Sequence, residues 1–160
     1  MKIFIILAAV VLIATPLTVS AQAGAKQQPQ IQRDAEMEKD SMHNLEVARH
    51  YFKLRKAYVA ALQRSEEIIA ANPAFSRIDE ALYMAGQSSL NLADGKGKQK
   101  SSLYVIHEGE TKKTLTTEEF RELARGFFTQ LINSYPESAF RVQAEDALRM
   151  LGGAKAVSKQ

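Results

Sequence analysis

The sequence predicts an all-α protein: a solenoid of about five helices arranged as helical hairpins, with an inserted loop or small β-hairpin. One pattern occurs twice, in residues 68–82 and 131–144. It is an amphipathic helix end, a proline, a short turn and a new helix with alanine eight positions after the proline. Apolar residues also recur at helical spacing through most of residues 34–151. Hairpins of this kind bury their apolar faces by stacking on their neighbours, which predicts a solenoid.

The first 23 residues have the pattern of a secretory signal peptide. Lys2 precedes an apolar run from Ile3 to Leu17, and Ala21-Gln22-Ala23 is a small-x-small cleavage site. A retained membrane anchor is the alternative, but the run is shorter than the roughly 20 apolar residues that a span requires. We therefore expect residues 1–23 to be removed and the mature chain to be exported.

Composition and charge exclude several classes of protein. The chain has no cysteine, so neither a disulfide nor a lipid attached to an N-terminal cysteine is expected. Its net charge of +3 is close to balanced and gives no argument for binding nucleic acid. Residues 24–33 are polar and are expected to form a disordered tether. Residues 34–151 are expected to form the helical domain, and residues 152–160, which begin with two glycines, a flexible tail.

Start and stop signals place the first three helices. The first is expected from about Asp34 to Leu54, and the second from Tyr58 to Ala71, where Asn72-Pro73 ends it because proline disfavours helix before it. The third begins near Ser76, since Ser76–Asp79 resembles a capping box.

A glycine and an insertion interrupt the helical pattern. Gly86 costs roughly 1 kcal/mol relative to alanine inside the third helix, which predicts close approach of a facing helix there. Residues 93–116 form an insertion in which 102–107 and 111–116 are able to pair as a small β-hairpin. Thr116–Glu119 is a full capping box for a fourth helix that ends at Pro136, and a fifth is expected over 139–151.

No enzyme or metal constellation is present in the sequence. The histidines are His43, His50 and His107, and the first two are seven residues apart, whereas a zinc pair usually needs a spacing of four. Gly86–Leu90 lacks the second glycine of a nucleophile elbow. We therefore expect no catalytic residue, no metal and no cofactor. A periplasmic hydrolase, an enzyme accessory and a self-assembling structural protein are the alternatives from other classes.

The spacing of the apolar residues suggests a family. The first two helices resemble a tetratricopeptide repeat in the order of Leu45, Ala48, Tyr51, Tyr58, Ala61, Leu62, Ile68 and Pro73. The two joints resemble the BamD/YbgF-like subgroup of that family through Pro73, Phe75, Ala81, Gly86, Pro136, Ser138, Phe140 and Ala144. Arg149 stands where that pattern would have a second glycine.

The resemblance covers residues 41–151 and implies a function. It implies a non-catalytic periplasmic scaffold that binds other envelope proteins and is similar to BamD, a lipoprotein of outer-membrane protein assembly. The alternative is a coordinator of cell-envelope constriction and peptidoglycan synthesis similar to CpoB (YbgF). The chain departs from BamD in having no lipid-anchoring cysteine and fewer repeats, so membrane association is expected only through partners. The sequence leaves the oligomeric state open.

Two sets of candidate binding residues follow. In the family that the chain resembles, the first helix of each pair lines a concave groove, which makes His50, Lys53, Tyr83, Gln87 and Asn91 groove candidates. Ordinary solvated faces and a packed Tyr83 are the alternative. The insertion carries Lys96, Lys98 and Lys100, which predict a basic arm for an acidic partner surface or lipid headgroups. A solvated loop is the alternative for that segment.

Overall fold

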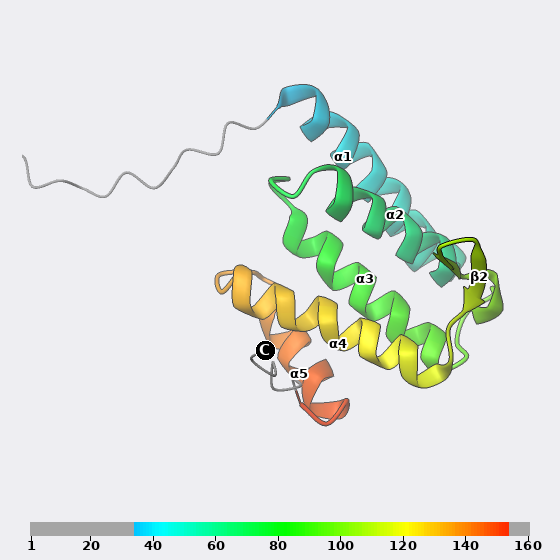
Figure 1. The fold of residues 1–160 in the computed structure, drawn as a ribbon. Helices are drawn as coiled ribbons and strands as arrows, with labels where there is room; N and C mark the ends of the chain where they lie inside the picture. The colour runs from blue at the N-terminus through cyan, green and yellow to red at the C-terminus, as the bar shows by residue number, and fades with distance from the viewer. Residues whose placement is uncertain (1–33, 154–160) are drawn as a thin grey trace, which may run out of the picture. The chain divides into compact units, whose positions relative to one another are not determined.

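The computed structural model describes residues 34–153 of the chain. The expected signal peptide (1–23), the expected tether (24–33) and residues 154–160 of the expected tail lie outside the described residues. The all-α fold with about five helices and an inserted hairpin is confirmed (Figure 1).

The helices and strands follow one another in a simple order. The α-helices are α1 (Ala35–Arg49), α2 (Tyr58–Ala71), α3 (Ile78–Ala93), α4 (Thr117–Ser134) and α5 (Arg141–Met150). A π-helix, η1 (His50–Arg55), continues α1, and a short 3-10 helix, η2 (Ser101–Leu103), follows α3. The strands β1 (Val105–Glu108) and β2 (Thr111–Thr114) form an antiparallel hairpin, with Val105 opposite Thr114 and Glu108 opposite Thr111.

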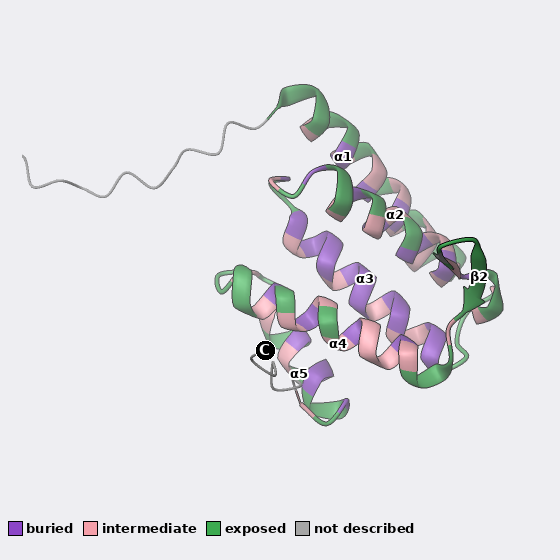
Figure 2. Ribbon diagram, viewed as in Figure 1, coloured by how far each residue is buried: buried purple, intermediate pink, exposed green. Residues whose placement is uncertain are grey.

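Helix α3 is the central element of the packing. It packs against α2 on one side and α4 on the other, and Figure 2 shows it buried along most of its length. Much of its buried surface consists of small residues, which let neighbouring helices approach closely: Ala81, Ala85, Gly86, Ser88 and Ser89. Helix α5 lies at the end of the order and exposes Val142 and Met150.

The close approach predicted at Gly86 is confirmed, but the neighbour is a side chain. A Cβ atom on Gly86 would lie 2.5 Å from Cε1 of the Phe128 ring, which comes from α4. Phe128 is fully buried. Glycine therefore makes room for an aromatic ring between α3 and α4.

The two proline joints have the same backbone hydrogen bonds. At each, the residue two positions after the proline donates its N–H to the carbonyl of the residue before the proline, at 3.0 Å in both joints. The residue five positions after the proline then donates its N–H to the carbonyl of the residue two positions after the proline. The distance is 3.2 Å before α3 and 3.1 Å before α5. The repeated sequence pattern is therefore a repeated turn.

One predicted cap is confirmed and one is wrong. At α4, the Glu119 N–H donates to Thr116 Oγ1 (3.3 Å) and the Thr116 N–H donates to the Glu119 carboxylate (2.8 Å), which is the predicted capping box. Helix α3 begins at Ile78 rather than near Ser76, and its N-cap residue makes no side-chain cap. The Ser76 N–H donates instead to the carboxylate of Glu38 on α1. A partner distant in sequence therefore takes the place of the local capping box.

Candidate functional site

The insertion between α3 and α4 is tied to the N-terminal helix pair by three hydrogen bonds. The Lys98 N–H donates to the carbonyl of Lys56 in the α1–α2 turn (2.9 Å). The side-chain oxygen of Gln99 accepts from the Ala60 N–H (3.1 Å), in the first turn of α2, where backbone donors lack helical partners. The Tyr104 hydroxyl donates to the Glu66 carboxylate on α2 (2.7 Å). The basic segment of the insertion therefore has a defined place beside the α1–α2 turn.

The backbone conformation of Gly97 and Lys56 allows the insertion to contact the α1–α2 turn. Gly97 has a φ of +93°, and a Cβ atom there would lie 2.6 Å from the Lys56 carbonyl oxygen and 2.6 Å from the Tyr58 ring. Glycine is required because both the conformation and the space exclude a side chain. Lys56 also adopts a left-handed conformation, with a φ of +50°. Its carbonyl is the acceptor for the Lys98 N–H.

The hydrogen bond between Tyr104 and Glu66 joins a phenol and a carboxylate in a largely buried contact. Burial raises the pKa of Glu66, and the hydrogen bond from Tyr104 only partly opposes that effect. Burial and the bond to Glu66 raise the pKa of the Tyr104 hydroxyl well above its ordinary value. Tyr104 also packs against Phe120 of α4, with ring centroids 5.6 Å apart. This residue therefore joins the insertion to both α2 and α4.

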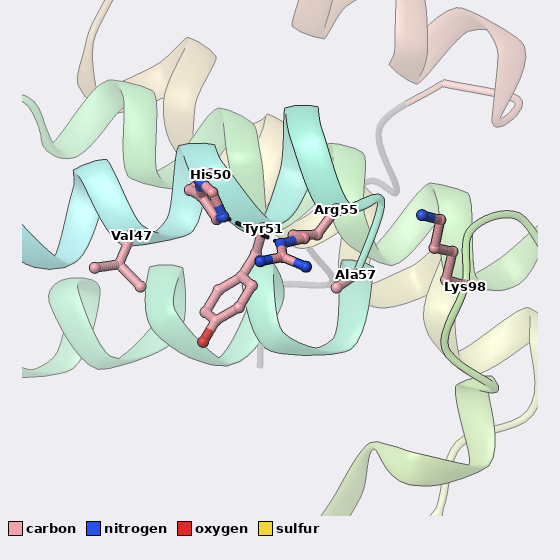
Figure 3. A pocket seen from close by; sticks show the side chains of 6 residues that line it. All are labelled: Val47, His50, Tyr51, Arg55, Ala57 and Lys98. Atoms are coloured by element: carbon pink, nitrogen blue, oxygen red, sulfur yellow. Dashed lines mark hydrogen bonds between the residues drawn. The ribbon is translucent and has the colours of Figure 1, made fainter.

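A pocket of about 460 Å³ lies where η1 meets the insertion (Figure 3). It is lined by Val47, His50, Tyr51, Arg55, Ala57 and Lys98. Figure 3 shows the His50 and Arg55 side chains pointing toward one another, and Arg55 Nε donates to His50 Nε2 at 3.3 Å. Widened π-helical turns are rare and frequently occur at functional sites. The pocket combines basic groups with the apolar side chains of Val47 and Ala57 and the Tyr51 ring.

The structure brings together one residue from each predicted set. His50 was a groove candidate and Lys98 was an insertion candidate, and both line the pocket. Lys53 is exposed on η1 and does not line it. Lys96 pairs with Asp94 (2.9 Å), and Lys100 is exposed just before η2.

The other three groove candidates lie on α3 and do not line this pocket. Tyr83 stacks on Phe140 at the start of α5, with centroids 4.8 Å apart, and also contacts Phe128 at 6.3 Å. Burial raises the pKa of its hydroxyl. Gln87 and Asn91 follow Tyr83 at intervals of four residues and are half-buried. Tyr83 therefore has a packing role, while Gln87 and Asn91 retain accessible surface.

Sequence patterns did not indicate the remaining residues of the pocket as binding residues, and Tyr51 entered only through the family resemblance. Arg55 and Lys56 mark a turn in the sequence, and no pattern distinguishes a π-helical turn from the end of an α-helix. The pair of adjacent cations was the available signal, but its significance depends on Lys98, which arrives from a distant segment.

Within residues 34–153, no group of three or more histidine, aspartate or glutamate side chains is arranged to hold a metal ion. No helix in that part of the chain combines the length and the apolar character that a membrane span requires.

Comparison with known proteins identifies a family. Neither the curated proteins nor the solved structures gave a match to the chain. Residues 36–150 match the family described as tetratricopeptide repeat. The match covers most of the chain and includes all five described α-helices apart from the first residue of α1. Tetratricopeptide repeats are in general a protein-interaction fold without catalytic activity, and this chain belongs to the tetratricopeptide-repeat family.

Proposed function

We propose that the protein is a non-catalytic periplasmic scaffold that binds other envelope proteins during outer-membrane protein assembly, in a role similar to that of BamD. The general part of this proposal rests on the family, because stacked helical repeats present extended surfaces for protein partners. The specific part rests on the two joints and on the sequence of residues 1–23.

The repeated joint is the observation that carries the proposal. The alanine eight positions after each proline, Ala81 in α3 and Ala144 in α5, is fully buried. Gly86, thirteen positions after the first proline, makes room for Phe128. The residues that carry the resemblance to the BamD/YbgF-like subgroup thus have physical roles in the packing of successive repeats.

The signal-peptide pattern of the N-terminal residues supports the same proposal. Residues 1–23 have a basic start, an apolar run and a small-residue cleavage site, which is the pattern of a signal peptide. The chain has no cysteine to carry a lipid, so we propose that it reaches the outer membrane through its partners.

The proposed mechanism is capture of an extended segment or a helix on the side formed by the first helices of the repeats. Gln87 and Asn91 on α3 are half-buried, and Lys53 on η1 is exposed. Apolar contacts would supply most of the affinity, and charged groups at the edge would select the partner.

Affinity capture of the tagged chain from crosslinked cell envelopes tests the proposal. Enrichment of the outer-membrane assembly barrel and its lipoproteins is the expected result. Enrichment of Tol or peptidoglycan-synthesis proteins without the barrel would overturn it in favour of the CpoB (YbgF)-like alternative. Fractionation, with mass spectrometry of the mature N-terminus, tests export, because the expected cleavage leaves a chain that begins at Gly24.

A pair of matched variants tests the proposed surface. Gln87→Arg with Asn91→Arg places two cations on the half-buried side of α3 and is expected to reduce capture of the partner. Gln130→Arg with Asn133→Arg adds the same two cations at exposed positions of α4 and is expected to leave capture unchanged. Equal loss in both would assign the effect to added charge rather than to the α3 surface.

A further inference from the structure

We infer that the pocket between η1 and the insertion binds an acidic segment of a partner protein, in which carboxylate side chains flank an apolar one. This inference deepens the proposed scaffold function and rests on it. It assigns a chemistry to the partner and places the contact at a feature that lies partly outside the repeats.

The cations of the pocket are available to a ligand. Arg55 and Lys98 are exposed, and neither forms an ion pair within the described part of the chain. The hydrogen bond that Arg55 makes goes to the His50 ring nitrogen Nε2, through the Arg55 Nε. The two terminal nitrogens of the guanidinium remain able to hold a carboxylate with two parallel hydrogen bonds.

Further cations lie in the two segments that form the pocket, and acidic residues are fewer in those segments. Lys53, Lys56 and Lys100 are exposed and make no ion pair among residues 34–153. Asp94 pairs with Lys96. Glu46, one turn before His50, acts electrostatically on Arg49, whose pKa is raised chiefly by its hydrogen bond to Glu80. A nearly balanced chain therefore presents a concentrated positive surface here, which favours an acidic partner.

The apolar lining distinguishes a peptide from a simple anion. Val47, Ala57 and the Tyr51 ring form part of the wall, and the volume of about 460 Å³ lies within the range of small ligand pockets. Leu54, next to Arg55, has 71% of its surface exposed and offers an adjacent apolar contact. A phosphate ion would use only the cations, whereas an apolar side chain between carboxylates would use both parts of the site.

The backbone conformation of Lys56 and Gly97 also favours the arrangement of this pocket. Lysine is an uncommon residue in the left-handed conformation, which is less favourable than the ordinary helical region for a residue with a side chain. Glycine at position 56 would avoid that cost but would remove a cation from the pocket edge. Gly97 lets the insertion approach closely enough to deliver Lys98 to the π-helical turn.

Fluorescence anisotropy with a designed peptide tests the inference on the full mature chain. The probe is a fluorescein-labelled peptide of leucines flanked by glutamates, and its control replaces every glutamate with glutamine. Arg55→Ala and Lys98→Ala are each expected to weaken binding of the glutamate peptide by about ten-fold, the effect of losing one charge-assisted hydrogen bond. Lys39→Ala removes an exposed lysine of α1 and is expected to change nothing.

Gly97→Ala separates geometry from charge. This variant keeps every cation but drives the insertion away from the Lys56 carbonyl and the Tyr58 ring. It is expected to weaken peptide binding about as much as Lys98→Ala, that is, about ten-fold. A circular dichroism spectrum and a single cooperative unfolding transition establish that the helices remain folded. Unchanged peptide affinity in folded Gly97→Ala would contradict the docking of Lys98 as the source of the site.

Several results would overturn the inference. One is equal binding of the glutamate and glutamine peptides, and another is full binding of the glutamate peptide by the Arg55→Ala/Lys98→Ala double variant. A third is binding to phosphatidylglycerol vesicles without binding to the peptide, which would assign the surface to a membrane. The envelope-capture experiment separates this failure from failure of the scaffold function. A double variant that captures the same partners as the wild type removes the pocket proposal alone, whereas a wild type that captures none removes the scaffold function.

Discussion

The joints before α3 and α5 follow the same backbone path but fix their helices with different side chains. Two positions after the proline, the first joint has Phe75, which is 2% exposed and packs with Leu45 and Ile68. The second joint has Ser138 at that position, whose hydroxyl donates to the Asp79 carboxylate of α3 (2.7 Å). At this position, one joint is therefore held by an apolar contact and the other by a hydrogen bond.

A charged group marks a second difference between the joints. Seven positions after the proline, α3 has Glu80, whose two carboxylate oxygens accept from Arg49 at 2.6 and 2.7 Å and from Arg77 at 2.6 Å. The same position in α5 is Gln143, which is exposed. The first joint lies against α1, whereas the second lies near the end of the helix order. Proline and the turn set the local path, and the neighbouring helices determine which side chains each joint requires.

The largest expected effect comes from the residue two positions after each proline. Phe75→Ala is expected to lower the free energy of unfolding by about 3–5 kcal/mol, because it empties a buried aromatic site. Ser138→Ala at the equivalent position is expected to cost about 1–2 kcal/mol, because its hydroxyl donates to Asp79 and accepts from the Phe140 N–H. Urea unfolding monitored by circular dichroism gives both values. Equal costs would show that the joints are stabilised in the same way after all.

Loss of the Glu80 carboxylate is expected to have the next largest effect. Glu80→Gln leaves Arg49 without its ionic partner, and loss of one member of a buried pair costs about 3–5 kcal/mol. The two arginine side chains are 25% and 47% exposed, so solvent reduces the expected cost to about 1–3 kcal/mol. Gln143→Ala at the equivalent position of α5 is the matched control and is expected to change stability by less than about 0.5 kcal/mol.

The pH dependence of the same variant sharpens this prediction. Burial alone would raise the pKa of Glu80, but the hydrogen bonds and charges of Arg49 and then Arg77 outweigh burial and hold the pKa below its ordinary value of 4.5. A depressed pKa contributes stability above pH 4.5 that is lost as the pH falls below that value. The difference in unfolding free energy between wild type and Glu80→Gln should therefore shrink on acidification. A constant difference down to acid pH would show that the carboxylate charge is not what stabilises the joint.

Gly86 gives a smaller expected effect. Gly86→Ala should gain about 1 kcal/mol in helix propensity. Against this, the new methyl group overlaps the Phe128 ring, and overpacking of a core costs about 1–3 kcal/mol. We expect a net loss of about 1 kcal/mol. A double-mutant cycle with Phe128→Leu measures the coupling, and the two changes should combine at less than the sum of their costs. Additive costs would exclude the ring as the cause.

Local signals in the sequence predicted most of the fold. The two prolines and the Thr116–Glu119 capping box act within a few residues, so their effect is visible without a structure. The Ser76 cap failed because Glu38, on another helix, supplies the hydrogen-bond acceptor instead. The sequence does not predict the π-helical turn either. That turn ends at Lys56, which has a left-handed backbone conformation and whose carbonyl accepts a hydrogen bond from the distant Lys98 N–H.

The candidate site was predicted only in pieces. The sequence indicates His50 as a groove residue and Lys98 as part of a basic arm, and it does not indicate Arg55 as a binding residue. Their assembly depends on contact between Gly97 and the α1–α2 turn, and glycine in a loop has many roles that composition does not distinguish. Tyr83 was proposed as a groove residue, but its ring packs on Phe140, a neighbour that belongs to the second joint.

Substitution of Gly126 is expected to have the smallest effect on the free energy of unfolding, and to raise it rather than lower it. It lies in α4, two positions before Phe128, but it is exposed, and a Cβ atom there would meet nothing within 4 Å. Gly126→Ala should therefore stabilise the protein by about 0.5–1 kcal/mol, because alanine limits the unfolded chain more and favours the helix. Urea midpoints compared with those of Gly86→Ala measure the contrast. If both substitutions destabilise, contact with the Phe128 ring cannot be the reason for glycine at position 86, since only one of the two sites faces that ring.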